Sequence, residues 1–160
     1  MAVNADQLKE SMRYWTTGVA IVCSRLGNEV HGMTVNSFTS ISVVPALVTV
    51  TLAKTTRTHE MVSDSGVFSI SILASDQAEI SDRFAGKIAE DQDRFEGVDS
   101  ISLASGVPAI AGGLAWLDCR VIQKYEMGSS TLFIGEVEEA LTKGGSPLIY
   151  HNRRYAVLGD

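Results

Sequence analysis

Runs in which apolar and polar residues alternate recur along the chain and predict a protein built mainly from β-strands. Most of these runs are rich in β-branched residues and are bounded by glycine, proline or asparagine, as is typical of strands that end in tight turns. A Gly-Asn pair at 27 and 28 predicts that the first two runs form a hairpin. The runs lie at 18–24, 32–40, 46–53, 67–73, 113–127, 130–142, 147–152 and 153–158.

Three segments have helical spacing instead. Asn4 or Asp6 can cap a first helix whose apolar stripe is Leu8, Met12 and Trp15, with Gly18 as its end. Residues 54–66 open with threonines suited to an N-cap and close on Gly66, which predicts one or two helical turns. A last helix is expected from a cap at Ser75 or Asp76 to about Phe84, with Ile80 one turn before it.

Hairpin-connected strands with two or three inserted helices favour a mainly β fold of the Greek-key barrel type. A doubly wound parallel sheet would need strands and helices to alternate regularly, and they do not. No internal repeat or linker divides the chain, so residues 1–160 are expected to form a single domain.

Composition excludes several classes of function. The chain is 45% hydrophobic and 20% charged, and its net charge of -6 leaves no overall positive field to attract nucleic acid. Its apolar stretches are too short to span a membrane, and its first 15 residues lack the apolar core of a signal peptide. We therefore expect a cytoplasmic protein with neither nucleic acid nor a membrane as its partner.

Familiar catalytic motifs are absent from the sequence. Cys23 and Cys119 lie in apolar runs and are expected to be buried free thiols, and the three histidines lack the spacing of metal ligands. The chain has no glycine-rich phosphate loop and no GxSxG motif. A bound nucleotide would have to be held in another way.

Two polar clusters remain as candidates. The first runs from Thr34 to Ser42, and the second runs from Lys54 to Thr58, where threonines, a lysine and Arg57 meet the start of a predicted helix. Free N–H groups and the dipole at a helix start favour an anion. Each cluster alone is equally typical of an exposed edge strand or of a simple helix cap. A strand of about eight residues joins them, so both could contact one elongated, phosphate-bearing ligand.

An ordered series of segments carries a family resemblance. "GMTVNSFTSIS", followed by Pro45 and "LVTVTL", resembles the short-chain flavin reductase family, the FMN-binding split-barrel proteins that serve two-component monooxygenases. The resemblance continues through "GVAIVCS", "TTRTHEMVSDSGVFSISIL", "ISDRFAGK", "DRFEGV", "GVPAIAGGLAWLDCRV", "LFIGEVEEA" and "PLIYHNRRY". About 140 residues are covered in order.

The resemblance implies a homodimer of split β-barrels that binds FMN or FAD near the subunit interface and takes hydride from NADH or NADPH. Residues at Thr34, Val35, Asn36, Ser37, Phe38, Ser40 and Ser42 would line the ring and the ribityl chain. Residues at Lys54, Thr55, Thr56 and Thr58 would lie along the ribityl and phosphate end, with Arg57 as a helper. The segment Phe84, Ala85, Gly86 and Lys87 matches one that approaches the flavin. The chemistry belongs to the cofactor, so no acid or base side chain is required.

The sequence departs from the family pattern at two places. Ser71 stands where many relatives carry an asparagine, and Ser129 and Ser130 stand where active reductases often have an aspartate and a histidine. That histidine is associated with the nicotinamide side of the pocket, to which Tyr155 is also assigned. A hydroxyl can still form a hydrogen bond with a carboxamide, so hydride transfer can survive the change.

Three functions follow from these residues. The first is an NAD(P)H-dependent flavin reductase that supplies reduced flavin to a separate monooxygenase. The second is a flavin-binding electron carrier reduced by a protein donor, which the lost histidine motivates. The third is a barrel that binds another small ligand.

Overall fold

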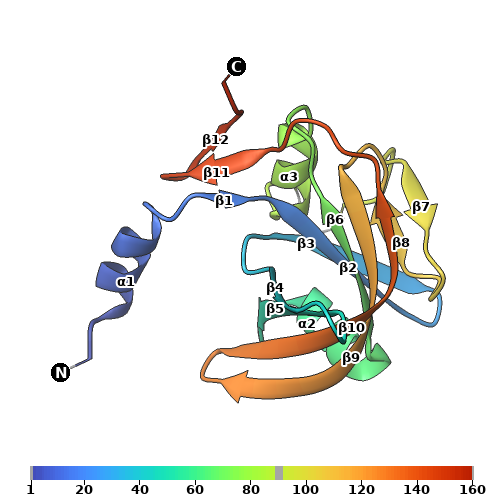
Figure 1. Ribbon diagram of the computed structural model, residues 1–160. Helices are drawn as coiled ribbons and strands as arrows, with labels where there is room; N and C mark the ends of the chain where they lie inside the picture. The colour runs from blue at the N-terminus through green and yellow to red at the C-terminus, as the bar shows by residue number, and fades with distance from the viewer. Residues whose placement is uncertain (1, 89–91, 160) are drawn as a thin grey trace.

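A computed structural model describes residues 2–88 and 92–159, and most of its strands form one antiparallel sheet (Figure 1). Several neighbours in the sheet are distant in sequence, as in a Greek-key fold, and the predicted mainly β architecture is confirmed. In spatial order the seven strands are β3 (Glu29–Val35), β2 (Ala20–Leu26), β6 (Val67–Ile72), β9 (Ala115–Met127), β10 (Ser130–Thr142), β5 (Leu47–Ala53) and β4 (Thr39–Ser42).

The chain connection between the two edge strands curls this sheet into a barrel. In a flat sheet of seven strands, β3 and β4 would lie about 29 Å apart, at about 4.8 Å per strand. Only residues 36–38 separate the two strands in sequence, and four extended steps reach at most about 14 Å. The two edges must therefore approach each other, and residues 36–38 form the seam of the barrel.

The predicted second arm of the first hairpin is thus two strands rather than one. β3 ends at Val35, and β4 pairs with β5 instead of continuing the pairing with β2. Val35 packs in the core, whereas Ile41 on β4 is 48% exposed.

The longest strands, β9 and β10, form a hairpin around Gly128, where φ is +60° and the left-handed backbone favours glycine. Gly135 in β10 permits close packing, because a Cβ atom there would lie 2.6 Å from the ring of Phe68.

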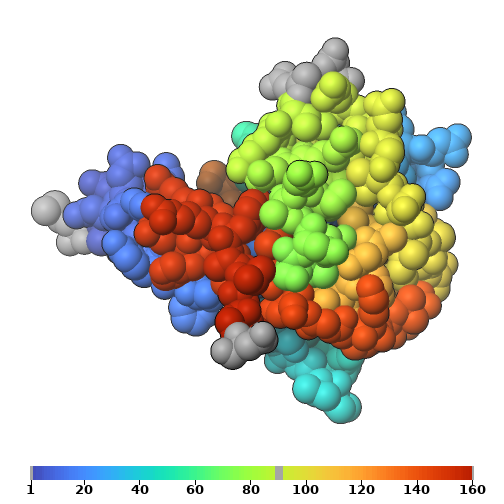
Figure 2. Space-filling model, turned by 90° about the horizontal axis from the view of Figure 1, so that it is seen from above, coloured from blue at the N-terminus to red at the C-terminus, as the bar shows by residue number. Residues whose placement is uncertain are grey.

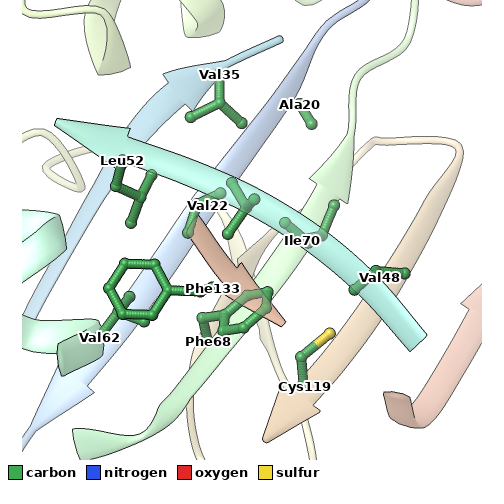
Figure 3. Packing of buried hydrophobic residues seen from close by; sticks show 11 residues of the cluster. Ala20, Val22, Val35, Val48, Leu52, Val62, Phe68, Ile70, Cys119 and Phe133 are labelled. Atoms are coloured by element: carbon green, nitrogen blue, oxygen red, sulfur yellow. The ribbon is translucent and has the colours of Figure 1, made fainter. Parts of the chain in front are cut away.

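Apolar side chains from both halves of the sheet meet inside the barrel (Figure 3). Phe68, Phe133 and Leu52 are completely buried. Cys119 lies in the same cluster and Cys23 in a second one, and both are free and buried as predicted. Burial raises the pKa of each thiol to about 12, so both remain protonated.

Two of the helices pack against the barrel. Helix α2 (Arg57–Ser65) begins at the Thr56 cap and ends at Gly66 in the left-handed conformation, as predicted, although it is longer than two turns. Helix α3 (Ala78–Phe84) begins after Gln77, so the predicted cap at Ser75 or Asp76 is wrong. The Gln77 side chain instead joins the backbone of Ala74 and Ala111.

Helix α1 (Ala5–Met12) lies apart from the barrel (Figure 1). Its cap at Asn4 is confirmed, with a capping box to Gln7, but it ends at Met12 rather than at Gly18. The predicted apolar stripe is exposed, and Trp15 lies beyond the end of the helix.

Short strands complete the molecule. β1 (Thr17–Gly18), β11 (Ile149–His151) and β12 (Arg154–Ala156) form a three-stranded sheet, and β7 (Ser100–Ser102) pairs with β8 (Pro108–Ile110). Sequence patterns predicted the last two strands of the chain but not β1, β7 or β8. The charged segment at 86–97 includes residues 89–91, which lie outside the described residues. Among the described helices, none is long and apolar enough to cross a membrane.

Candidate functional site

The seam of the barrel is the first part of the site. Residues 36–38 lie outside both strands, and their main-chain groups make no backbone hydrogen bonds with other described residues. Ser37 fixes the seam to β5, because its hydroxyl donates to the Thr51 carbonyl at 2.8 Å and accepts from the Thr51 N–H at 3.3 Å. Backbone donors and acceptors are thus held in place and left open to a ligand.

A groove of about 630 Å³ runs along this seam, which is a usual size for a cofactor site. We refer to it as the seam groove. Its lining is Trp15, Thr16, Thr17, Gly18, Val19, Ala20, Val35, Asn36, Ser37, Phe38, Thr39 and Ile72. The Thr17 hydroxyl oxygen is buried without a hydrogen-bond partner among the described residues. A buried polar atom in this state is costly and points to a ligand or water that satisfies it.

A smaller space of about 240 Å³ adjoins the seam groove and shares Val19, Val35 and Asn36 with it. We refer to it as the tyrosine hollow. Its lining is Val19, Thr34, Val35, Asn36, Ser81, Ala85, Lys87, Tyr150, Arg153 and Tyr155. Figure 2 shows the C-terminal hairpin (red) against α3 (green), the two elements between which much of this hollow lies.

A hydrogen-bond network holds the tyrosine hollow together. The Tyr155 hydroxyl lies 2.7 Å from the Asp82 carboxylate and 2.8 Å from the Ser81 hydroxyl. Lys87 pairs with Asp82 at 2.8 Å. The Lys87 hydrogen bond, followed by that of Tyr155, holds the pKa of Asp82 below its usual value, so Asp82 stays ionised. Thr34 donates its hydroxyl to the Ser81 carbonyl and thereby ties β3 to α3.

The start of α2 is the third part of the site. Thr56 caps the helix by accepting from His59 N–H at 3.2 Å, and its hydroxyl also donates to the Ala53 carbonyl. Lys54 forms an ion pair with Glu126, and Arg57 forms one with Glu29 at 2.7 Å. Lys54, Thr55 and Thr56 face an open surface depression there, so they are placed to meet an anion at the helix start.

Two predicted cofactor residues lie inside the protein rather than in the site. Thr58 is fully buried, and its hydroxyl lies 2.8 Å from His31 Nδ1. Phe84 is also fully buried and packs edge-on against Phe95, with ring centroids 5.1 Å apart. A neighbour of each residue lies at the site instead. Thr56 lines the depression at the start of α2, and Ala85 lines the tyrosine hollow.

The remaining cofactor positions, Ser40, Ser42 and Gly86, do not line the seam groove. Ser40 and Ser42 are on β4, with no side-chain hydrogen bond to another described residue. Gly86 is exposed, and its φ of +82° favours glycine, but it lines a different depression, between β3 and the segment after α3.

The structure does not bring together the positions assigned to the nicotinamide side. Ser129 and Ser130 lie at the β9–β10 turn, where the Ser129 carbonyl accepts from Lys54 N–H at 2.9 Å. Tyr155 lies in the tyrosine hollow, whose lining includes neither of these serines. Ser71, the other departure from the family pattern, is buried and accepts from Ile110 N–H at 2.9 Å, which is a structural role.

Sequence reasoning missed several residues of the site, namely Trp15, Thr17, Val19, Ser81, Tyr150 and Arg153. Thr17 fell within the predicted first helix, and Gly18 was assigned both to the end of that helix and to the start of the run at 18–24. The only sequence signal for Arg153 was its place in a polar "NRR" turn beside the predicted Tyr155.

The comparisons with known proteins agree with this geometry. A family model described as "Flavin reductase like domain" matches residues 12–159. The chain is 33% identical to the actinorhodin polyketide dimerase of Streptomyces coelicolor, with 99% of this chain and 89% of that protein covered. It is 34% identical to an NADH-dependent flavin reductase of a Rhodococcus species, with 94% and 85% covered.

Two further similarities extend over almost the whole of both chains. The reductase component of 4-hydroxyphenylacetate 3-monooxygenase from Thermus thermophilus is 33% identical, with 96% of each protein covered. The solved structure of the flavin reductase PheA2 in its native state has a TM-score of 0.90 at 32% identity, covering 99% of this chain and 100% of that one.

Proposed function

The chain belongs to the flavin reductase-like family, and we propose that it is an NADH-dependent flavin reductase that reduces FMN or FAD. Membership confirms the resemblance drawn from the sequence. The observation that carries the activity is the seam groove, which combines open main-chain groups, the unsatisfied Thr17 hydroxyl and a volume suited to a cofactor. These features fit a flat, polar-edged ring such as that of a flavin.

The protein's own residues bind and orient the flavin in this proposal. Thr34 to Phe38, with Ser40 and Ser42 nearby, line the ring and the ribityl chain, while Lys54, Thr55 and Thr56 hold the phosphate at the start of α2. Apolar Val35 and Ile72 line the groove and limit water at the ring. A bound flavin accepts the hydride of the reduced nicotinamide itself, so the chain needs to supply no acid or base.

Reduced flavin is proposed to pass to a separate monooxygenase, as the name of the Thermus relative implies for that protein. One relative of similar identity is named a polyketide dimerase rather than a reductase, so sequence identity of about one third does not identify the protein that receives the reduced flavin. The acceptor therefore has to be identified by experiment rather than by similarity.

We also propose a homodimer. Apolar side chains stay exposed on the β4–β5 connection, where Val43 and Val44 are 85% and 90% exposed. Others lie on β9, where Tyr125 and Met127 are about half exposed. A second copy that covers these faces would remove this apolar surface from water. Light scattering on Val44→Asp should then show a smaller particle than the wild-type protein.

Turnover decides the proposed function. Purified protein is mixed with FMN or FAD and with NADH or NADPH, and loss of the reduced-nicotinamide absorbance is followed. Oxidation well above the protein-free rate is expected with NADH. A protein that keeps a yellow cofactor but oxidises neither dinucleotide would instead be an electron carrier reduced by a protein donor, and a protein that binds no flavin would belong to neither class.

A further inference from the structure

We propose that Arg153, assisted by Lys87, binds a phosphate group of the reduced nicotinamide dinucleotide in the tyrosine hollow. This proposal rests on the proposed function, because it assigns the place of the hydride donor next to the flavin. It starts from the backbone of the C-terminal hairpin.

The turn between β11 and β12 has an unusual residue in it. Asn152 and Arg153 connect the two strands with φ angles of +49° and +62°, and both lie in the left-handed region. Two-residue turns of this kind favour Asn followed by Gly, because a side chain at the second position is strained. Arginine therefore stands where glycine would be easier to accommodate.

The fold explains Asn152 but not Arg153. Asn152 accepts from Arg13 Nε at 3.0 Å, and its N–H donates to the Arg13 carbonyl at 2.8 Å, so it anchors the N-terminal segment. Arg153 makes no hydrogen bond or ion pair through its side chain with any residue in 2–88 or 92–159. A strained residue whose side chain makes no hydrogen bond or ion pair within the fold points to a role outside it.

The surroundings of Arg153 show what that role can be. Its side chain lines the tyrosine hollow together with Lys87. Asp82 faces the same network but is already engaged by Lys87 and by Tyr155. One carboxylate thus offsets one of the two cations, and the guanidinium of Arg153 is left to pair with an anion. Its planar set of donors suits a phosphate.

The place of the tyrosine hollow relative to the seam groove indicates which nucleotide supplies the phosphate. The flavin phosphate is assigned to Lys54, Thr55 and Thr56, which follow β5 and line a depression that shares no residue with the tyrosine hollow. The tyrosine hollow instead adjoins the seam groove directly and shares Val19, Val35 and Asn36 with it. A second nucleotide whose reactive ring meets the flavin in the groove would extend its phosphates into this hollow.

The matched control for this site is Arg154, the next residue in the chain. It has the same charge and is also exposed, but it does not line the hollow. Side chains alternate along β12, so Arg154 points away from the face that carries Tyr155. Arg154→Gln and Arg153→Gly therefore change the net charge equally at adjacent positions.

The test compares wild type, Arg153→Gly, Arg153→Lys and Arg154→Gln. Calorimetry with ADP-ribose, which carries the phosphates but no nicotinamide, should show an affinity about 10-fold weaker in Arg153→Gly, partly recovered in Arg153→Lys and unchanged in Arg154→Gln. The KM for NADH should rise by a similar factor at an unchanged kcat. The KM for a phosphate-free dihydronicotinamide and the FMN affinity should stay the same. The melting temperature of Arg153→Gly should not fall, because glycine adopts the φ of +62° without strain.

Several results would overturn the assignment. These are wild-type affinity for ADP-ribose in Arg153→Gly, an equal loss in Arg154→Gln, or weaker binding of FMN in place of ADP-ribose. A wild-type protein that oxidises no dihydronicotinamide would refute the proposed function, whereas the calorimetric comparison would still decide whether Arg153 binds phosphate.

Discussion

The start of α2 and the seam of the barrel are both rich in hydroxyls, yet the protein uses them differently. At α2, Thr56 caps the helix, Thr58 is buried against His31, and Lys54 and Arg57 are paired with carboxylates. At the seam, the main chain of 36–38 is open and the Thr17 hydroxyl has no described partner. Most polar side chains at α2 already have a partner within the fold, whereas these polar groups at the seam have none among the described residues.

This difference shows why polar clusters alone do not identify a binding site. Hydroxyls that already have partners gain little from a ligand, since each new hydrogen bond replaces an existing one. Groups that folding leaves unpaired but fixed in place gain the most from a ligand. The following changes test the contrast, beginning with the largest expected effect.

Filling the seam groove should abolish flavin binding without unfolding the protein. A Cβ atom at Gly18 would meet no other atom within 4 Å, so Gly18→Phe can project into the groove without a clash at its base. The flavin dissociation constant, measured by fluorescence, should rise by more than about 100-fold through steric exclusion. The melting temperature should change little. Normal flavin affinity in this variant would place the cofactor elsewhere.

Removing the α2 cap should destabilise the fold, in addition to weakening the proposed contact with the flavin phosphate. Thr56→Ala leaves the His59 N–H without its acceptor and should lower the free energy of unfolding by about 1 kcal/mol in urea denaturation. Thr55→Ala is the control, since the neighbouring Thr55 is exposed and makes no side-chain hydrogen bond with a described residue. An equal loss of stability in both variants would contradict the capping role.

His31 should make the α2 region sensitive to acid. Burial, followed by repulsion from Arg94 and Arg57, lowers its pKa from 6.5 to about 4. The unfolded chain therefore binds a proton between pH 6.5 and pH 4 that the folded protein does not, and stability is complete above pH 6.5 and falls as the pH drops toward 4.

Because His31 is only half-buried, solvent screening should limit this loss of stability to about 1 kcal/mol. Unfolding in urea at pH 7.0 and 4.5 should show a smaller decrease for His31→Gln than for wild type. The same decrease in both proteins would assign the acid sensitivity to other groups.

The smallest effect is expected at Thr17. Thr17→Val replaces an unsatisfied buried hydroxyl with a methyl group of similar size, so it should leave stability unchanged or raise it by up to about 1 kcal/mol. Flavin binding should weaken a few-fold if the ligand satisfies that hydroxyl. Thr16→Val is the contrast, because the Thr16 hydroxyl already lies 2.8 Å from His151 Nδ1, and this change should cost stability.

Most strands could be predicted because their alternation reflects burial on one face. Gly66, at the end of α2, and Gly128, in the β9–β10 turn, could be predicted because their backbone conformation favours glycine. The break in 32–40 could not be predicted, since it depends on the meeting of two sheet edges that the sequence does not show. The exposure of Leu8, Met12 and Trp15 could not be predicted either, because an apolar stripe at helical spacing does not identify the element that packs against it.

The site was predicted in part for the same reason. Segments such as 34–38 and 54–56 could be assigned from the family pattern, which follows the chain. Thr58 and Phe84 match that pattern but point inward, and side-chain direction depends on how α2 and α3 pack. Arg153 and Thr17 join the site only through the three-stranded sheet, which pairs residues more than 130 positions apart.

The three-residue connection between β3 and β4 also sets where the barrel can open. Every other neighbouring pair of strands is held by a ladder of main-chain bonds, whereas this junction depends on Ser37 and Thr51. Transient separation should therefore begin there, and amide hydrogens beside it should exchange fastest. A ligand bound across residues 36–38 would hold β3 and β4 together. The rate at which the barrel opens should therefore be lower in the ligand-bound protein than in the free protein.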